Sequence, residues 1–200
     1  MKEIILAALR FAKERMKNNF DGHDYYHAER VYKKAVQLAD KEQANVFITG
    51  LAAILHDIDN VSVLETQNDT NDCIIAREFL QSQSLDIKDI DIVCDIINYV
   101  SKRPSGNHMS KSKEAMCVSD ANTLDAIGVI GIARAISWGA VNGQILYDGD
   151  LHGDSTIKAF YDKLLPLSSN MKTDSGREMA IDRTDKINDF LQQFYYEWNL

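Results

Sequence analysis

The chain has 200 residues, of which 45% are hydrophobic and 26% charged, and its formal net charge is −8 at pH 7. A chain of this length buries roughly 70% of its unfolded surface, so folding requires neither disulfides nor a structural metal. The acidic balance argues against a nucleic-acid polymer as partner, because binding a phosphate backbone needs a basic face. Its 3 cysteines are odd in number, far apart and without a CxxC pair, which predicts reduced, buried thiols.

Helices are expected along most of the chain. Only 2 prolines and 10 glycines interrupt it, and apolar residues recur at helical spacing. The expected helices cover about 3–18, 24–40, 43–56, 71–83, 86–101, 114–138, 155–166 and 176–198. The sequence therefore predicts an all-α protein, a bundle of roughly eight to ten helices in a single domain over residues 1–200.

The first expected helix indicates the cellular location of the protein. It reads MKEIILAALRFAKERMK, with charges at both ends and within the apolar stretch, and it lacks a small-residue cleavage site. We interpret it as an amphipathic helix and not as a signal peptide. No apolar run approaches the ~20 residues that a membrane span needs. A cytoplasmic protein without a membrane partner is expected.

Three later features bear on the position of a site. The DGHD stretch that ends at Asp24 forms a turn that can cap the following helix. The helix expected at 43–56 contains NVFITGLAAILH, which is apolar nearly all round and is expected at the centre of the bundle. Gly128 and Gly131 in the long helix at 114–138 indicate either close helix packing or a break. The polar stretches 102–113 and 139–154 are expected as loops around the opening.

Several histidines and acidic residues lie within or at the ends of apolar helices, where polar side chains are uncommon. His56 and Asp57 end the most apolar helix, where an imidazole and a carboxylate are costly to bury unless something pairs with them. A divalent cation satisfies both, because imidazole nitrogen and carboxylate oxygen are compatible ligands for Mn, Fe, Ni, Co or Zn. His27 lies in the first turn of another helix, and the acids Asp120 and Asp125 lie within an apolar one. Each signal is weak alone, but the ordered combination predicts a metal site.

This ordered pattern resembles the HD superfamily of metal-dependent phosphohydrolases. The resemblance covers nearly the whole chain, through GHDYYHAERV, AAILHDIDN, INYVS, DANTLDAIGVIGIARA, LYDGD, FYDKLLPL, MKTDSGREMA and FLQQFYYEW. Its LDAIG-IGIAR and FY-KLL segments are particular to a bacterial branch of predicted HD hydrolases. The resemblance implies an HD-domain helical bundle in which His27, His56 and Asp57 are the first three metal ligands. The implied cofactor is a divalent ion (Mn, Fe, Ni, Co, Mg or Zn).

The fourth ligand of the family is an Asp, and here the sequence departs from the pattern. The branch's Asp-Ala-Asp-Arg-Leu-Asp reads DANTLD, which places Asn122 at the ligand position and Thr123 at that of a phosphate-contacting basic residue. Asn still offers a carbonyl oxygen to a metal. Asp120 is the alternative ligand, although two residues along a helix place it roughly 200° around the axis. Weaker metal affinity or reduced activity is expected.

Further residues are candidates for the chemistry. Asp59 is the candidate general acid/base, or orients the attacking water, with a helix-end role as the alternative. Arg30, one turn after His27, and Arg134 can neutralise phosphate charge by bidentate contact. For each arginine, an ordinary intramolecular salt bridge is the alternative.

The resemblance implies a phosphohydrolase of the nucleotide pyrophosphatase or phosphatase type. The acidic chain favours a small phosphorylated substrate, a nucleotide, over a polymer, and a homo-oligomer is compatible with it. One rival is a cyclic-nucleotide phosphodiesterase, but the stretch from Asn98 to Ser101 lacks the extra His that a second metal needs. Another is a nucleotide sensor or scaffold that has lost turnover, which Asn122 and Thr123 favour. A helical protein with purely structural His and Asp leaves the acids of the apolar helix unexplained.

Overall fold

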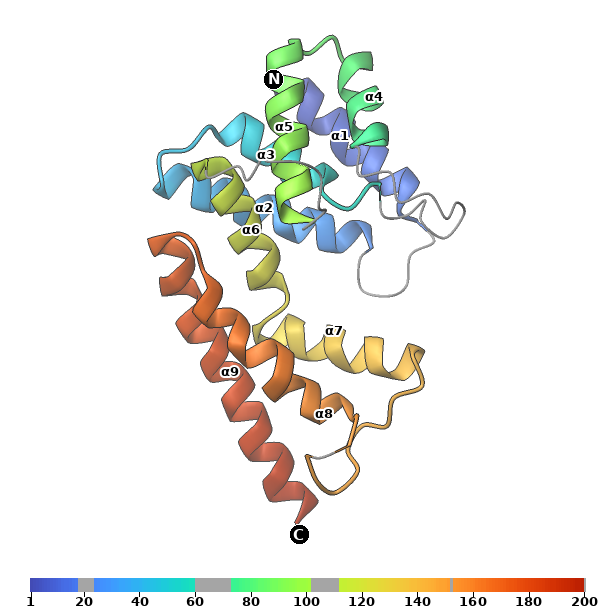
Figure 1. The fold of residues 1–200 in the computed structure, drawn as a ribbon, viewed down its shortest axis with the longest axis vertical. Helices are drawn as coiled ribbons and strands as arrows, with labels where there is room; N and C mark the ends of the chain where they lie inside the picture. Colours follow the sequence, from blue (N-terminus) through green and yellow to red (C-terminus); the bar gives the residue numbers. More distant parts are fainter. Residues whose placement is uncertain (18–23, 60–72, 102–111, 152, 200) are drawn as a thin grey trace. The chain divides into compact units, whose positions relative to one another are not determined.

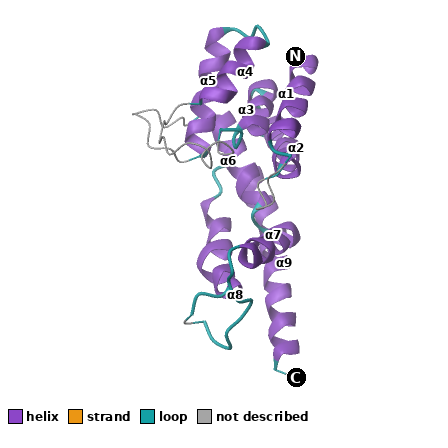
Figure 2. Cartoon of the chain, turned by 90° about the vertical axis from the view of Figure 1, so that its right-hand side faces the viewer, coloured by secondary structure: helices purple, strands orange, loops and turns teal. Residues whose placement is uncertain are grey.

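The computed structural model describes residues 1–17, 24–59, 73–101, 112–151 and 153–199 (Figure 1). These residues form nine α-helices, a π-helical turn and a 3-10 segment, and no strand is found among them (Figure 2). The predicted all-α class is therefore confirmed.

The chain divides into two compact units, Met1–Ala121 and Asn122–Leu200. The first contains α1 (Lys2–Arg15), α2 (Tyr25–Lys41), α3 (Val46–Leu55), α4 (Ile74–Ser82) and α5 (Ile87–Val100). The second contains α7 (Gly128–Val141), α8 (Thr156–Ala159), the π-helical turn η2 (Phe160–Leu164), the 3-10 segment η3 (Leu165–Asn170) and α9 (Asp174–Trp198). Helix α6 (Lys113–Asp125) runs across the boundary. The single domain over residues 1–200 stays a prediction.

Helix α3 is the centre of the first unit and packs against α1, α2 and α5. Every residue from Ile48 to Leu55 is buried, as its almost wholly apolar sequence predicts. The helix begins after Asn45, whose side-chain oxygen accepts hydrogen bonds from the backbone N–H groups of the second and third residues that follow, at 3.1 and 3.2 Å. At Gly50 an added Cβ would lie 3.1 Å from the ring of Tyr32, so a glycine lets α2 approach closely.

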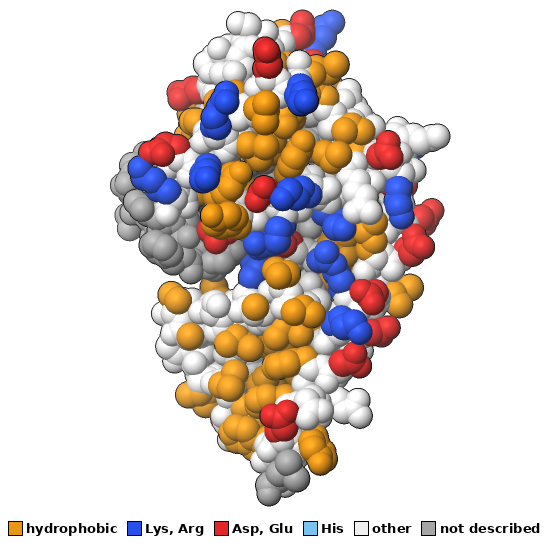
Figure 3. All heavy atoms as spheres, turned by 180° about the vertical axis from the view of Figure 1, so that it is seen from behind, with side chains coloured by type: hydrophobic (Ala, Val, Ile, Leu, Met, Phe, Trp, Pro, Cys, Tyr) orange, Lys and Arg blue, Asp and Glu red, His pale blue; other side chains and the backbone are white. Residues whose placement is uncertain are grey.

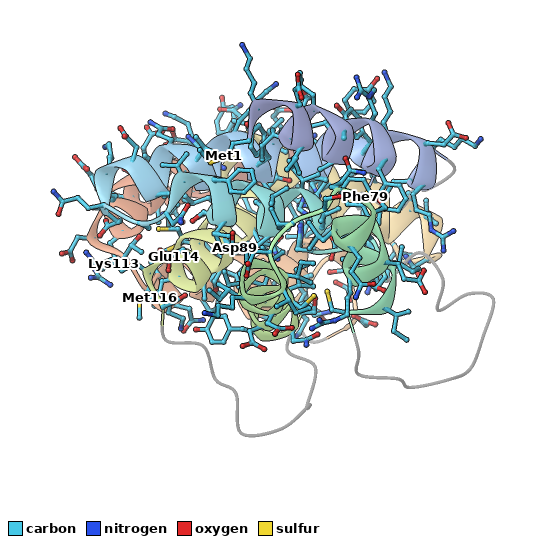
Figure 4. All side chains as sticks on the ribbon, turned by 90° about the horizontal axis from the view of Figure 1, so that it is seen from above. Met1, Phe79, Asp89, Lys113, Glu114 and Met116 are labelled. Carbon is cyan, nitrogen blue, oxygen red and sulfur yellow. The ribbon has the colours of Figure 1, made fainter. Side chains whose placement is uncertain are left out.

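The beginning of α6 is bound to the turn that precedes α3 (Figure 4). The Nζ of Lys113 donates to the Glu42 carbonyl at 2.9 Å, and the backbone N–H of Asn45 donates to Oε1 of Glu114 at 2.8 Å. Burial alone would raise the pKa of Glu114. The hydrogen bond from Asn45, with further ones from its own backbone N–H and from Ser112, outweighs burial and lowers that pKa below its ordinary value.

The long helix expected at 114–138 is two helices, α6 and α7. The residue that starts α7, Gly128, has a φ of +76°, which L side chains rarely adopt, and an added Cβ there would lie 3.1 Å from the Arg183 side chain. At Gly131 an added Cβ would lie 2.3 Å from the carbonyl oxygen of Ala126. The two glycines thus serve different purposes: the first allows the break and the second allows close packing after it.

Helix α9 organises the second unit, and α7 and η3 pack against it. Its C-terminal half carries an aromatic cluster, in which the rings of Phe194 and Trp198 stack with centroids 5.7 Å apart. Tyr147 meets the Trp198 ring edge-on at 4.9 Å. The helix expected at 155–166 is shorter than predicted, because the chain passes from α8 into the π-helical turn and the 3-10 segment.

The three cysteines are buried and free, as the sequence predicts. Burial, with the nearby carboxylates, raises the pKa of Cys117 to about 12. The thiol is therefore protonated at neutral pH, and Cys117 behaves as a small apolar core residue.

Hydrophobic side chains are exposed on the second unit, where Figure 3 shows them gathered over one face in the lower half of the view. Exposed large apolar residues of this unit include Val129, Val141 and Ile181. No single helix within the described ranges is long and apolar enough to cross a membrane, and α6 with α7 meets that test only as a broken pair, by length and composition.

We predict that Glu114→Gln lowers the free energy of unfolding at pH 7 by about 0.5–1 kcal/mol, because a half-exposed charge-assisted hydrogen bond is weakened. The pKa of Glu114 is lowered in the folded state, so its stabilisation is present above the unfolded value of about 4.3 and is lost as the pH falls through the folded value. The difference from the unmodified protein should therefore shrink below pH 4 in urea titrations. The control is Glu3→Gln, in the first turn of α1. An equal loss in both variants would assign the effect to the helix dipole alone.

Candidate metal centre

His27 is placed by the cap that starts α2. Asp24 precedes the helix in an extended conformation, and its Oδ1 accepts a hydrogen bond from the His27 backbone N–H at 2.8 Å. This capping interaction, which the sequence predicts, holds His27 in the first turn. The imidazole is fully buried and points into the first unit.

His56 is placed by the end of α3. It is the C-cap residue, with φ −60° and ψ −29°, and its Nδ1 lies 2.9 Å from the carbonyl oxygen of Ala53. A carbonyl only accepts, so Nδ1 carries the hydrogen, and in the neutral ring Nε2 carries a lone pair. On its backbone side, the His56 carbonyl accepts a hydrogen bond from Oγ of Ser101 at 3.2 Å.

The two imidazoles meet the carboxylate of Asp57. Its Oδ2 lies 3.5 Å from Nε2 of His27 and 3.2 Å from Nε2 of His56. The two rings are 5.2 Å apart between centroids and inclined by 64°. The ligand atoms of all three residues lie within 4.8 Å of one another, and Asp57 is only 8% exposed.

The charges of this cluster fit a bound cation. Burial alone would raise the pKa of Asp57, but the charge of His56 and hydrogen bonds from both imidazoles outweigh it and hold that pKa well below its usual range. These effects require protonated imidazoles, because a neutral His56 ring with its hydrogen on Nδ1 turns the lone pair of Nε2 towards Asp57 and repels it. A proton on one ring or a metal ion between the three groups removes the repulsion. Two imidazole nitrogens and a carboxylate oxygen form a donor set that fits a divalent transition metal.

Asp59 lies beside this cluster and binds the start of another helix. Its Oδ1 accepts a hydrogen bond from the backbone N–H of Ile75 at 2.8 Å, and its Oδ2 accepts a longer one from Ala76 at 3.5 Å. Asp59 is buried and therefore holds the first turn of α4 against the end of α3. The predicted helix-end role is observed, although at a helix remote in sequence, and the acid/base role stays a prediction.

The remaining predicted residues of the first unit are Asp120 and Arg30. Asp120 is 1% exposed on α6, and Arg30 is half-buried on α2. Among the described residues, the group whose ligand atoms meet within 4.8 Å consists of His27, His56 and Asp57, without Asp120. Ligation by Asp120 and phosphate contact by Arg30 stay predictions.

Asn122 and Arg134 belong to the second unit. The Nη1 of Arg134 donates to Oδ2 of Asp125 at 2.9 Å and to the Asp125 carbonyl at 3.3 Å. This is the intramolecular salt bridge that the sequence analysis gave as the alternative, and it binds α7 to the end of α6. Metal ligation by Asn122 and phosphate binding by Arg134 stay predictions.

Comparisons with known proteins identify the family of this chain. The HD domain family model matches residues 24–127. The chain is 34% identical over 176 residues to the uncharacterised protein YpgQ of Bacillus subtilis, covering 86% of this chain and 82% of that protein. A crystal structure of an HD-superfamily hydrolase from Bacillus thuringiensis is similar, with a TM-score of 0.81, 32% identity and coverage of 99% and 98% of the two chains. The structure of B. subtilis YpgQ in complex with ADP has a TM-score of 0.76, 30% identity and coverage of 96% and 97%.

We predict that Asp57→Asn weakens Mn²⁺ binding to the metal-stripped protein by about 100-fold or more, because the charged ligand is lost. Titration calorimetry measures this affinity. Mn²⁺ at 100 times its dissociation constant should stabilise the unmodified protein by about 2.7 kcal/mol, and the variant should lose most of that gain. The matched control is Asp91→Asn, which removes the surface ion pair with Arg77 and should leave binding unchanged. Equal affinities in both variants would exclude Asp57 as a ligand.

Proposed function

Because the chain belongs to the HD domain family, we propose that it is a metal-dependent phosphohydrolase acting on a small phosphorylated substrate, a nucleotide, in a reaction of the pyrophosphatase or phosphatase type. The observation that carries the proposal is the buried cluster of His27, His56 and Asp57. Burying an ionised carboxylate between two imidazole nitrogens costs free energy of folding, and metal binding would explain why the three groups lie together.

A nucleotide is the favoured substrate for two reasons. The structure of B. subtilis YpgQ, 30% identical to this chain, is a complex with ADP. The net charge of −8 disfavours a polyanionic polymer, whereas a free nucleotide presents few phosphates, which one metal centre and one or two arginines can neutralise.

In the proposed mechanism, different residues hold the metal, orient its ligands, transfer a proton and bind phosphate. A divalent ion held by His27, His56 and Asp57 would supply charge neutralisation for a phosphate oxygen and a water of lowered pKa. The Ala53 carbonyl orients the His56 ring, and the Asp24 cap holds His27 in its turn. Asp59 is the candidate to hold or move a proton, and Arg30 and Arg134 are the candidates to bind the remaining phosphate charge.

A nucleotide sensor with weakened turnover is the second candidate. Asn122 and Thr123 stand where the bacterial branch has a ligand Asp and a basic residue. A neutral ligand leaves the centre with one negative charge fewer, which lowers its affinity for a divalent ion. This candidate keeps nucleotide binding and loses hydrolysis.

We predict that the metal-stripped protein resupplied with Mn²⁺ hydrolyses at least one member of a nucleotide panel, with products separated by chromatography. Release of pyrophosphate identifies a pyrophosphatase, and release of phosphate identifies a phosphatase. The activity should need metal and fall to background in His56→Ala, because the ring is a ligand. Activity that persists in this variant would come from a contaminant or another site. If the protein binds metal but hydrolyses no nucleotide, the result favours the sensor over the enzyme as its function.

We also predict that the double substitution Asn122→Asp with Thr123→Arg raises Mn²⁺ affinity about tenfold or more, since an anionic ligand replaces a neutral one. Turnover should increase with it, or first appear if the protein is a sensor. Calorimetry and the nucleotide assay measure the two effects. Asn122→Gln with Thr123→Lys is the control that adds the basic charge without the carboxylate. Equal affinities in the two double variants would exclude position 122 from the metal centre.

A further inference from the structure

The last turn of α5 reaches the metal centre through one side chain. Ser101 is the C-cap residue of α5, with φ −73° and ψ −1°, and its backbone N–H bonds to the carbonyl of Ile97. Its hydroxyl is therefore available for a second interaction and donates to the carbonyl of His56 at 3.2 Å. Both residues belong to the first unit, although 45 positions separate them in the sequence.

The acceptor of this hydrogen bond is a particular carbonyl. It belongs to the peptide group that joins His56 to Asp57, so its direction fixes the plane from which both ligand side chains leave the backbone. The His56 ring is already held by Ala53 through Nδ1. Ser101 contacts the backbone carbonyl of His56 itself, so ring and backbone are each held by a hydrogen bond.

A second polar group lies on the same side of α5. Asn98 is three residues before Ser101 and therefore shares its helix face. Its Oδ1 is buried and makes no hydrogen bond within the described residues. A buried amide oxygen without a hydrogen bond destabilises the folded state. The last turn of α5 therefore carries two polar side chains on one face, and Ser101 is the one that contacts the ligand-bearing turn.

We propose that Ser101 is a positioning residue of the metal centre, which acts by holding the His56-Asp57 peptide and makes no contact with metal or substrate itself. The inference rests on the proposed function only for the presence of a metal, and not on the identity of the substrate. Loss of an interaction that orients a ligand typically costs 10–100-fold in metal affinity. A hydroxyl that merely completes a helix end would change stability and leave metal affinity untouched.

The test compares four full-length, metal-stripped proteins by calorimetric titration with Mn²⁺ and, separately, Zn²⁺: unmodified, Ser101→Ala, Ser101→Thr and Ser82→Ala. The last is the matched control, because Oγ of Ser82 donates to the Phe79 carbonyl at 2.6 Å at the end of α4. Ser101→Ala should bind metal about tenfold more weakly. Ser101→Thr keeps the hydroxyl and should bind within about threefold of the unmodified protein, and Ser82→Ala should bind unchanged.

Two outcomes would overturn the proposal. One is equal affinity in Ser101→Ala and Ser82→Ala, and the other is an unmodified protein that binds neither ion. If Ser101→Ala does not fold, Ser101→Cys replaces it, since a thiol fills similar space and donates weakly; affinity equal to that of the serine protein then overturns the inference. If the protein binds metal but hydrolyses no nucleotide, the proposed enzymatic activity is wrong. The metal affinities of the Ser101 variants still test the role of Ser101 in that case.

Discussion

A carboxylate buried between two imidazole nitrogens is the interaction on which the first unit depends. Burial raises the pKa of Asp57, but His56 and His27 outweigh this effect and hold that pKa well below its usual range. The three groups come from the start of one helix and the end of another, so they meet where α2 and α3 pack together. A charge in a core needs a compensating partner, and His27 and His56 lie next to the carboxylate with donor atoms that could share a cation with it.

The two histidines are oriented by different means. His27 owes its position to a backbone N–H bound by the Asp24 cap, whereas the His56 ring is bound directly to the Ala53 carbonyl. The Asp24 cap fixes the first turn of α2, and the hydrogen bond to Ala53 fixes the tautomer of the His56 ring. Asp59 then joins the same chain segment to the start of α4. Hydrogen bonds to backbone groups therefore surround the cluster, and backbone groups place side chains more firmly than flexible side-chain partners do.

The helices were predictable because apolar spacing shows which face of a helix is buried. The candidate centre was predictable because His56 and Asp57 follow an almost wholly apolar helix. The break before α7 was not assigned, since periodicity carries no information on φ and Gly128 fits either packing or a break. The contact of Asp59 with α4 and that of Ser101 with His56 join residues remote in sequence. Local patterns do not encode such pairs, so they become visible only in the folded chain.

Helix α3 has a consequence for how this protein can change over evolution. From Ile48 to Leu55 it offers no solvent-facing position, so almost any substitution there alters the packed volume. The same helix leads directly into His56 and Asp57, so a change of core volume also moves these two candidate ligands. Variation that tunes this centre is thereby directed to its neighbours, such as the cap at Asp24 or the end of α5, while α3 itself can drift only through compensated pairs of substitutions.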